Sequence, residues 1–126
     1  MDGLTIHEAA ATTGWSARML RYIEDIGLVS ADRSGSGYRL YGPQQLQRLR
    51  TLRELLRGFD LELGDVGFAA RLQRDPQLRA AIDAWLAATA VRPRDVAPSD
   101  WLRFEQDKHS KLLALPHREN PIKESA

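Results

Sequence analysis

Two arginines and a tyrosine share one face of a helix that the sequence predicts for residues 17–26. Ser16 is a typical N-cap residue, and Arg18, Arg21 and Tyr22 follow at helical spacing with apolar side chains on the opposite face. Guanidinium groups and phenol hydroxyls donate hydrogen bonds to phosphate oxygens and to acceptor atoms of base edges. The pattern therefore suits a helix that lies in the major groove of DNA. The alternative is an ordinary amphipathic surface helix, on which exposed arginines are common.

A β-hairpin is predicted directly after this helix, over residues 31–41. A Gly-Ser-Gly sequence at residues 35–37 supplies a flexible turn, and Arg33 and Arg39 fall on the two arms. A basic side chain beside such a turn can reach a neighbouring phosphate or the minor groove. We therefore interpret the hairpin as the wing of a DNA-binding domain. A surface loop with incidental arginines is the alternative.

Another short helix is predicted just before the first one. Thr5 and Glu8 form a T-x-x-E capping box, which indicates a helix over residues 6–13 that ends at Gly14. Only Gly14 and Trp15 then separate this helix from the N-cap of the next. Such a tight turn is typical of a helix-turn-helix, in which the first helix braces the second and the second enters the groove.

Two further helices are predicted between the hairpin and the C-terminal third of the chain. Pro43 begins the first and Gly58 ends it, and its leucines recur at helical spacing and are expected in the core: Leu46, Leu49, Leu52 and Leu56. Asp60 can cap the next helix, over residues 61–72. Two glycines within that helix each weaken it by about 1 kcal/mol relative to alanine.

The C-terminal third predicts two more helices, separated by a segment that contains two prolines. The first covers residues 76–90, and the second covers residues 101–115 with Ser99 or Asp100 as its N-cap. We expect these helices to form a hairpin. An isolated hairpin is marginal in water, so its apolar side chains should pack on the DNA-binding part of the chain, on a second copy, or around a small apolar ligand. The side chains concerned are Leu78, Ile82, Trp85, Trp101 and Phe104.

The run from Leu4 to about Ala70 resembles the N-terminal domain of the MerR family of bacterial transcription regulators. The series S-x-R-x-L-R-Y, GL and GYR-x-Y carries the resemblance, within LTIHEAAATTGWSARMLRYIEDIGLV and SGYRLYGPQQLQRLRTLRELLRGFDLEL. It implies that the helix predicted over residues 17–26, called the reading helix from here on, and the wing contact DNA. With Arg33 added from the hairpin pattern, the expected DNA-binding residues are Ser16, Arg18, Arg21, Tyr22, Arg33, Tyr38, Arg39 and Tyr41.

The resemblance also implies a mechanism. Regulators of the MerR type bind promoter DNA as dimers, and they kink and untwist the spacer so that the two promoter elements are realigned for RNA polymerase. The expected partners are therefore double-stranded promoter DNA, a second copy of the chain and, indirectly, RNA polymerase, with a small apolar effector as a further candidate. The alternative is an effector-independent architectural or co-regulatory DNA-binding module.

Together these patterns predict a mainly α-helical fold in three parts. Residues 1–72 are expected to form a winged helix-turn-helix domain with four helices and a two-stranded wing. Residues 73–115 are expected to form the C-terminal helical hairpin, as a dimerisation or regulatory region. Residues 116–126 are predicted to be a disordered tail.

Charge is distributed unevenly along the chain. Residues 1–58 carry eight arginines against six acidic residues, whereas residues 59–126 carry ten basic and eleven acidic residues. The basic surplus thus lies in the predicted DNA-binding half, but the net charge of the chain is only +1. Affinity for DNA must therefore come from placed contacts, two-fold repetition and groove geometry more than from bulk charge.

Composition argues against several other functions. The chain has no cysteine, and soft metal ions and iron–sulfur clusters are held by thiolates. Glu105 and His109 share a helical face, but we expect that face to be solvated, and no metal or cofactor is predicted. No nucleophile elbow, phosphate loop or carboxylate–histidine cluster points to an enzyme. No membrane-spanning run or signal peptide is evident, so a cytoplasmic location is expected.

Overall fold

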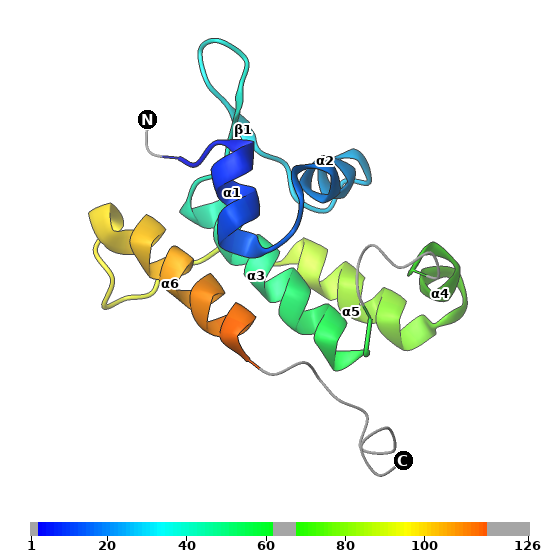
Figure 1. Cartoon of the computed structure of the whole chain (residues 1–126). Coiled ribbons are helices and arrows are strands. Elements are labelled where there is room, and N and C mark those ends of the chain that lie inside the picture. The colour runs from blue at the N-terminus through cyan, green and yellow to red at the C-terminus, as the bar shows by residue number, and fades with distance from the viewer. Residues whose placement is uncertain (1–2, 62–67, 116–126) are drawn as a thin grey trace.

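The computed structural model describes residues 3–61 and 68–115, and Figure 1 shows how their elements are arranged. Within these residues the chain forms six α-helices, one short 3₁₀ helix and one two-stranded antiparallel sheet. The mainly α-helical fold class predicted from the sequence is confirmed. In chain order the elements are α1 (Ile6–Thr13), α2 (Ala17–Asp25), β1 (Asp32–Arg33), β2 (Arg39–Leu40), α3 (Pro43–Gly58), α4 (Phe68–Arg74), α5 (Pro76–Ala87), η1 (Pro98–Asp100) and α6 (Trp101–Ala114).

The boundaries of the early helices follow from local sequence signals. In α1 the Thr5 side chain accepts from the Glu8 amide while the Glu8 side chain accepts from the Thr5 amide, so the predicted capping box is confirmed. Gly14 ends α1 with a left-handed φ of 82°. α3 spans the predicted residues, with Pro43 in its first turn. These ends were predictable because each depends on residues within one turn of the chain.

The core forms around α3. The four leucines of its predicted stripe are buried, and they pack in one cluster with apolar side chains from both the helix-turn-helix and the C-terminal region, among them Ala9, Leu20, Ile23, Leu78 and Ile82. Figure 1 shows α3 with α6 along one side and α5 along the other. Because α3 lies between these helices, one core cluster contains residues from both sides of residue 72. The domain boundary expected at residue 72 stays a prediction.

The two C-terminal helices pack differently from the predicted hairpin. α6 lies against α3 and α1, and α5 lies against α4 and contacts α3 through Trp85. Leu78, Ile82 and Trp85 are buried within the chain, whereas Trp101 and Phe104 are half-buried. Side chains that the chain itself covers cannot form a seam with a second copy. For Leu78, Ile82 and Trp85 core packing, one of the three alternatives, is confirmed and the expectation of a dimer seam is wrong; a ligand pocket at these residues stays a prediction.

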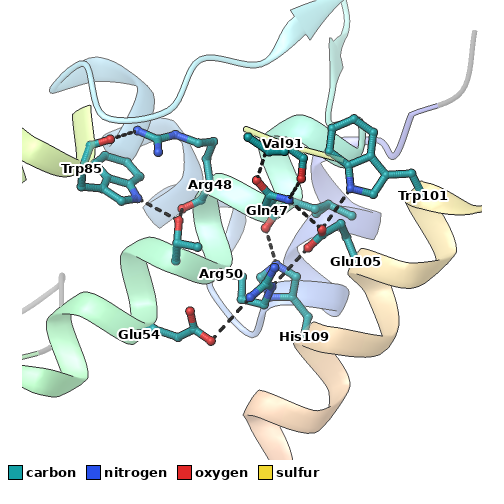
Figure 2. Close-up of polar contacts among 11 residues, drawn as sticks. Gln47, Arg48, Arg50, Glu54, Trp85, Val91, Trp101, Glu105 and His109 are labelled. Carbon is teal, nitrogen blue, oxygen red and sulfur yellow. Dashed lines mark hydrogen bonds and ion pairs between the residues drawn. The ribbon is translucent and has the colours of Figure 1, made fainter. Parts of the chain in front are cut away.

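Trp85 joins α5 to α3 through polar contacts as well as through its ring (Figure 2). Its indole Nε1 donates to the Thr51 hydroxyl at 2.8 Å. The guanidinium carbon of Arg48 lies 3.9 Å from the centroid of the indole ring, and Arg48 also donates to the Trp85 carbonyl. A cation over an aromatic face adds to the packing energy when the pair is withdrawn from water. The bond to Thr51 satisfies the indole N–H, which is the polar group that burial of a tryptophan introduces.

Glu105 and His109 attach α6 to α3, and neither side chain has measurable exposure. The prediction of a solvated face is therefore wrong, because α6 turns this face toward α3. The Glu105 carboxylate accepts from Arg50 Nε at 3.2 Å, from Gln47 Nε2 at 3.2 Å and from Trp101 Nε1 at 3.0 Å (Figure 2). These three donors offset the cost of removing a carboxylate from water. Among the described residues no group of three His, Cys, Asp or Glu side chains is placed to hold a metal ion.

The ring of His109 has one satisfied and one unsatisfied nitrogen. Nε2 lies 2.7 Å from the Leu46 carbonyl oxygen, which only accepts, so Nε2 carries the proton. Nδ1 is buried without a hydrogen-bond partner. Burial lowers the pKa of His109; the Leu46 bond and nearby Glu105 raise it, and the positive charges of Arg50 and Arg53 lower it further. The imidazole is therefore held in its neutral form.

Three other predictions concern the less regular parts of the chain. Half of the helix expected over residues 61–72 falls on residues 62–67, which the structure does not describe; Leu61 is not helical, and the described helical part is α4 (Phe68–Arg74). The tail expected at residues 116–126 also lies outside the described residues. α6 begins as predicted but without a side-chain cap, because Asp100 belongs to η1 and has a helical backbone. The predicted cap is therefore wrong.

Replacing Trp85 should separate core packing from surface effects. We expect Trp85→Ala to lower the free energy of unfolding by about 3–5 kcal/mol, because it leaves a cavity between α5 and α3 and removes the bond to Thr51. Leu86→Ala is the matched control, since Leu86 is the next residue on α5 and is 43% exposed; it should cost less than about 1 kcal/mol. Urea denaturation followed by circular dichroism measures both. Equal losses would contradict the proposed role of Trp85.

The buried imidazole predicts a pH dependence of stability. Since the pKa of His109 is lowered from 6.5, its contribution is complete above that value and is lost as the pH falls toward the lowered pKa. We expect the free energy of unfolding to decrease between about pH 7.5 and pH 5.5, by at most about 1.4 kcal/mol per pH unit. His109→Gln should flatten this slope, whereas His7→Gln, at an exposed position, should preserve it. An unchanged slope in His109→Gln would show that another group titrates.

Candidate nucleic-acid interface

The second helix of the helix-turn-helix is held by a cap at its start and by its apolar face. The Ser16 hydroxyl accepts from the Met19 amide at 3.1 Å, as the sequence predicted for an N-cap. Leu20 and Ile23 are buried in the core. α2 ends at Asp25, one residue earlier than predicted. The cap and the apolar face together determine which side of α2 remains on the surface.

That surface carries the side chains expected to read DNA. Arg18 and Arg21 are exposed, and Tyr22 is exposed beside them. Ile26, the last residue of the helix predicted from the sequence, lies just beyond the end of α2 and is also exposed. The predicted positions of Arg18, Arg21 and Tyr22 on one free face are thus confirmed, and their contact with DNA remains a prediction.

The hairpin that follows α2 is organised by Ser34. The Ser34 amide donates to the Tyr38 carbonyl at 2.8 Å, and the Ser34 hydroxyl accepts from the amides of Ser36 and Tyr38. Gly37 closes the turn with a φ of 88°, a conformation that favours glycine. Tyr38 is 72% exposed, and the turn projects away from the helical body (Figure 1). The structure therefore contains the predicted wing and presents a large aromatic side chain on it.

Arg33 and Arg39 occupy opposite positions on the two strands of the wing. They are partners in the register of β1 and β2, and like charges placed directly opposite each other destabilise a hairpin. Glu24, in the last turn of α2, resolves this conflict. Its Oε1 accepts from Arg39 Nε at 2.8 Å and from Arg33 Nη2 at 3.2 Å. One carboxylate thereby joins both arms of the wing to the reading helix.

The same carboxylate also holds the segment that leads into the wing. Glu24 Oε2 accepts from the Ala31 amide at 3.1 Å. Partial burial raises the pKa of Glu24, but the bonds from Arg39 and Ala31 and the positive charges of Arg33 and Arg39 outweigh it, so the pKa lies below its ordinary value. Glu24 is therefore ionised at neutral pH and holds the wing with a full negative charge.

Tyr41 does not belong to the DNA-facing surface. The residue is 1% exposed, and its hydroxyl is buried without a hydrogen-bond partner. Backbone bonds between Leu4 and Tyr41, both 2.8 Å long, hold the residue under the wing. Burial, followed by the charge of Glu24, raises the pKa of the Tyr41 hydroxyl. The prediction that Tyr41 contacts DNA is wrong, because packing in the core takes up its side chain.

Sequence reasoning missed Glu24, although one signal was present. A carboxylate in the last turn of a helix opposes the negative end of the helix dipole, so it requires a compensating cation. The sequence does not indicate which cation, since Arg33 and Arg39 are 9 and 15 residues away. The structure thus brings the two predicted wing arginines together with a third residue that orients them.

The fold and this surface define a class of protein. A helix-turn-helix with a free basic face, followed by a wing that carries exposed basic and aromatic side chains, is the architecture of a winged helix-turn-helix DNA-binding protein. The family model described as MerR HTH family regulatory protein matches residues 4–67. The chain belongs to this family of transcription regulators.

Curated relatives agree with the family model. An uncharacterized HTH-type transcriptional regulator of Pseudomonas aeruginosa is 39% identical over 90 residues, which are 71% of this chain and 67% of the relative. Heavy metal-dependent transcription regulator 2 of Rhizobium meliloti is 44% identical over 115 residues, 90% of this chain and 59% of the relative. The HTH-type transcriptional regulator CueR of Escherichia coli O157:H7 is 38% identical over 80 residues, which are 62% of this chain and 58% of the relative.

The chain spans 58% to 67% of the length of these three relatives. No solved structure matches it. In the part of the chain that the structure describes, none of the helices has the length and apolar character needed to cross a membrane.

Substitutions on α2 test the reading face. We expect Arg18→Ala to weaken binding to the operator by about 1–3 kcal/mol, because it removes a charged donor from the free face, and Tyr22→Phe to cost about 1 kcal/mol or less. Fluorescence anisotropy with labelled operator DNA measures both. Lys111→Ala removes the same charge from the last turn of α6, which Figure 1 places far from the wing, and should bind like the unmodified chain. Wild-type affinity for Arg18→Ala would contradict the assignment of this face.

Proposed function

We propose that this regulator binds promoter DNA as a homodimer and alters the geometry of the spacer, which changes how RNA polymerase engages the two promoter elements. The observation that carries the proposal is the pairing of a free basic face on α2 with a wing that Glu24 holds beside it. A helix in the major groove together with a wing on the adjacent backbone gives two points of attachment on one DNA segment. Such attachment is what bending and untwisting require.

Charge and size support a dimer. The net charge of +1 provides little non-specific attraction, so affinity depends on the number of placed contacts. One winged module reads few base pairs, and a two-fold arrangement doubles the site. The contact between copies has to involve side chains other than Leu78, Ile82 and Trp85, since these are already buried.

Composition and packing both bear on whether the protein responds to an effector. One relative is named a heavy metal-dependent regulator, but this chain has no cysteine to supply a thiolate ligand. Three of the side chains considered for a small apolar effector pack in the core of the chain itself. That packing favours a second candidate, an effector-independent architectural or co-regulatory module on the same DNA-binding domain.

Footprinting on the promoter upstream of its own gene tests the proposal and separates the two candidates. We expect the purified protein to protect a two-fold symmetric site between the promoter elements and to make the central base pairs hypersensitive to cleavage, because a bent and untwisted spacer exposes them. Transcription in vitro with RNA polymerase should then change when the spacer length is altered. A dimer mass in solution, measured by sedimentation, provides the independent check on assembly.

Other outcomes have distinct meanings. Direct repeats or extended protection without a distorted centre would support the architectural module instead. Absence of protection at low salt, where electrostatic contacts are strongest, would contradict promoter binding by this chain.

A further inference from the structure

We infer that Glu24 is the positioning residue of the DNA interface: it orients the guanidinium groups of Arg33 and Arg39 so that their remaining N–H donors face the phosphate backbone. The inference rests on the proposed function, because it assumes that the wing lies against DNA. It assigns to an acidic side chain a role in binding a polyanion, which charge alone would not suggest.

The geometry converges on one carboxylate. Glu24 Oε1 receives the bonds from Arg39 and Arg33, and Oε2 receives the bond from the Ala31 amide. A hairpin whose strands are two residues long has little rigidity of its own. The three bonds that the Glu24 carboxylate accepts therefore hold the wing beside the reading helix.

Both arginines keep donors for a second partner. Arg39 uses Nε, and Arg33 uses one terminal nitrogen, for the bond to Glu24. Within residues 3–61 and 68–115 no acceptor is bonded to the two terminal nitrogens of Arg39 or to Nε and Nη1 of Arg33. The side chains are 26% and 48% exposed, respectively. A guanidinium held on one edge presents its other edge in a defined direction, which suits phosphate oxygens.

A positioning role for Glu24 and simple charge repulsion predict opposite changes in DNA affinity when the Glu24 side chain is neutralised. A carboxylate near DNA repels phosphate, so removing its charge strengthens binding if charge alone matters. If Glu24 positions the arginines, removing its charge frees both side chains and the wing, and binding weakens because their ordering must then occur on the DNA. The sign of the change therefore decides between the two roles.

The experiment compares Glu24→Gln with Asp32→Asn in operator binding. Asp32 is exposed on β1 beside Arg33, and no hydrogen bond or ion pair of its side chain is present in the described part of the chain. We expect Glu24→Gln to bind about tenfold more weakly and Asp32→Asn to bind as tightly as, or about twofold more tightly than, the unmodified protein. A thermal melt of each variant confirms that the domain is folded at the temperature of the assay.

The salt dependence of affinity adds a readout that a purely structural role would not move. The slope of log affinity against log salt should fall by about 0.9 for each phosphate that the protein no longer neutralises, so Glu24→Gln should reduce it and Asp32→Asn should not. Arg39→Lys provides a second variant that keeps the charge. A lysine ammonium lacks the planar group of N–H donors with which one arginine can bond Glu24 and a phosphate at the same time. We therefore expect this variant to bind DNA about fivefold more weakly.

The outcomes distinguish this inference from the proposed function. If the unmodified protein fails to bind DNA at low salt, the proposed function itself is wrong. If it binds, and Glu24→Gln binds equally or more tightly with an unchanged salt slope, only the positioning role is wrong. Weaker binding with a lower slope, alongside a normal Asp32→Asn variant, supports the role of Glu24.

Discussion

Burial of α3 between the helix-turn-helix and the C-terminal helices is the constraint on which the rest of the structure depends. Its leucine stripe fills the core, so neighbouring positions on the same helix are also drawn into contact with α5 and α6. Polar side chains at those positions had to find partners out of water. Arg48 and Thr51 find them on Trp85, and Gln47 and Arg50 find them on Glu105. The C-terminal helices are therefore attached by polar contacts as well as by apolar packing.

The wing illustrates the same dependence on tertiary contacts at smaller scale. Two short strands do not make a stable hairpin in water, and two arginines placed opposite each other weaken it further. Glu24 and the backbone pairing of Leu4 with Tyr41 supply what the hairpin lacks. As a result the wing, the reading helix and Leu4 hold one another in place. Under the proposed function, recognition of DNA by this module depends on residues that need not touch DNA themselves.

Much of the N-terminal architecture could be predicted because its signals are local. The capping box of α1, the Ser16 cap of α2, the glycine turn of the wing and the leucine stripe of α3 each involve residues a few positions apart. Errors arose where packing decides. Tyr41 matched a family motif and was assigned to DNA, but it is buried; Glu105 and His109 were assigned to solvent, but they face α3. Periodicity identifies which residues share a face and does not identify what covers that face.

The sequence by itself determined where most helices begin and end, the presence of a winged helix-turn-helix, and membership in a family of transcription regulators. Capping and turn residues act within a few positions, and a motif is readable without a structure. Only the tertiary structure decided that the C-terminal helices flank α3, that Trp85 is a core residue, and that Glu24 holds both wing arginines. These outcomes depend on which surfaces bury the most apolar area together and on which charges are then brought within hydrogen-bond distance. Neither is a property of neighbouring residues in the chain.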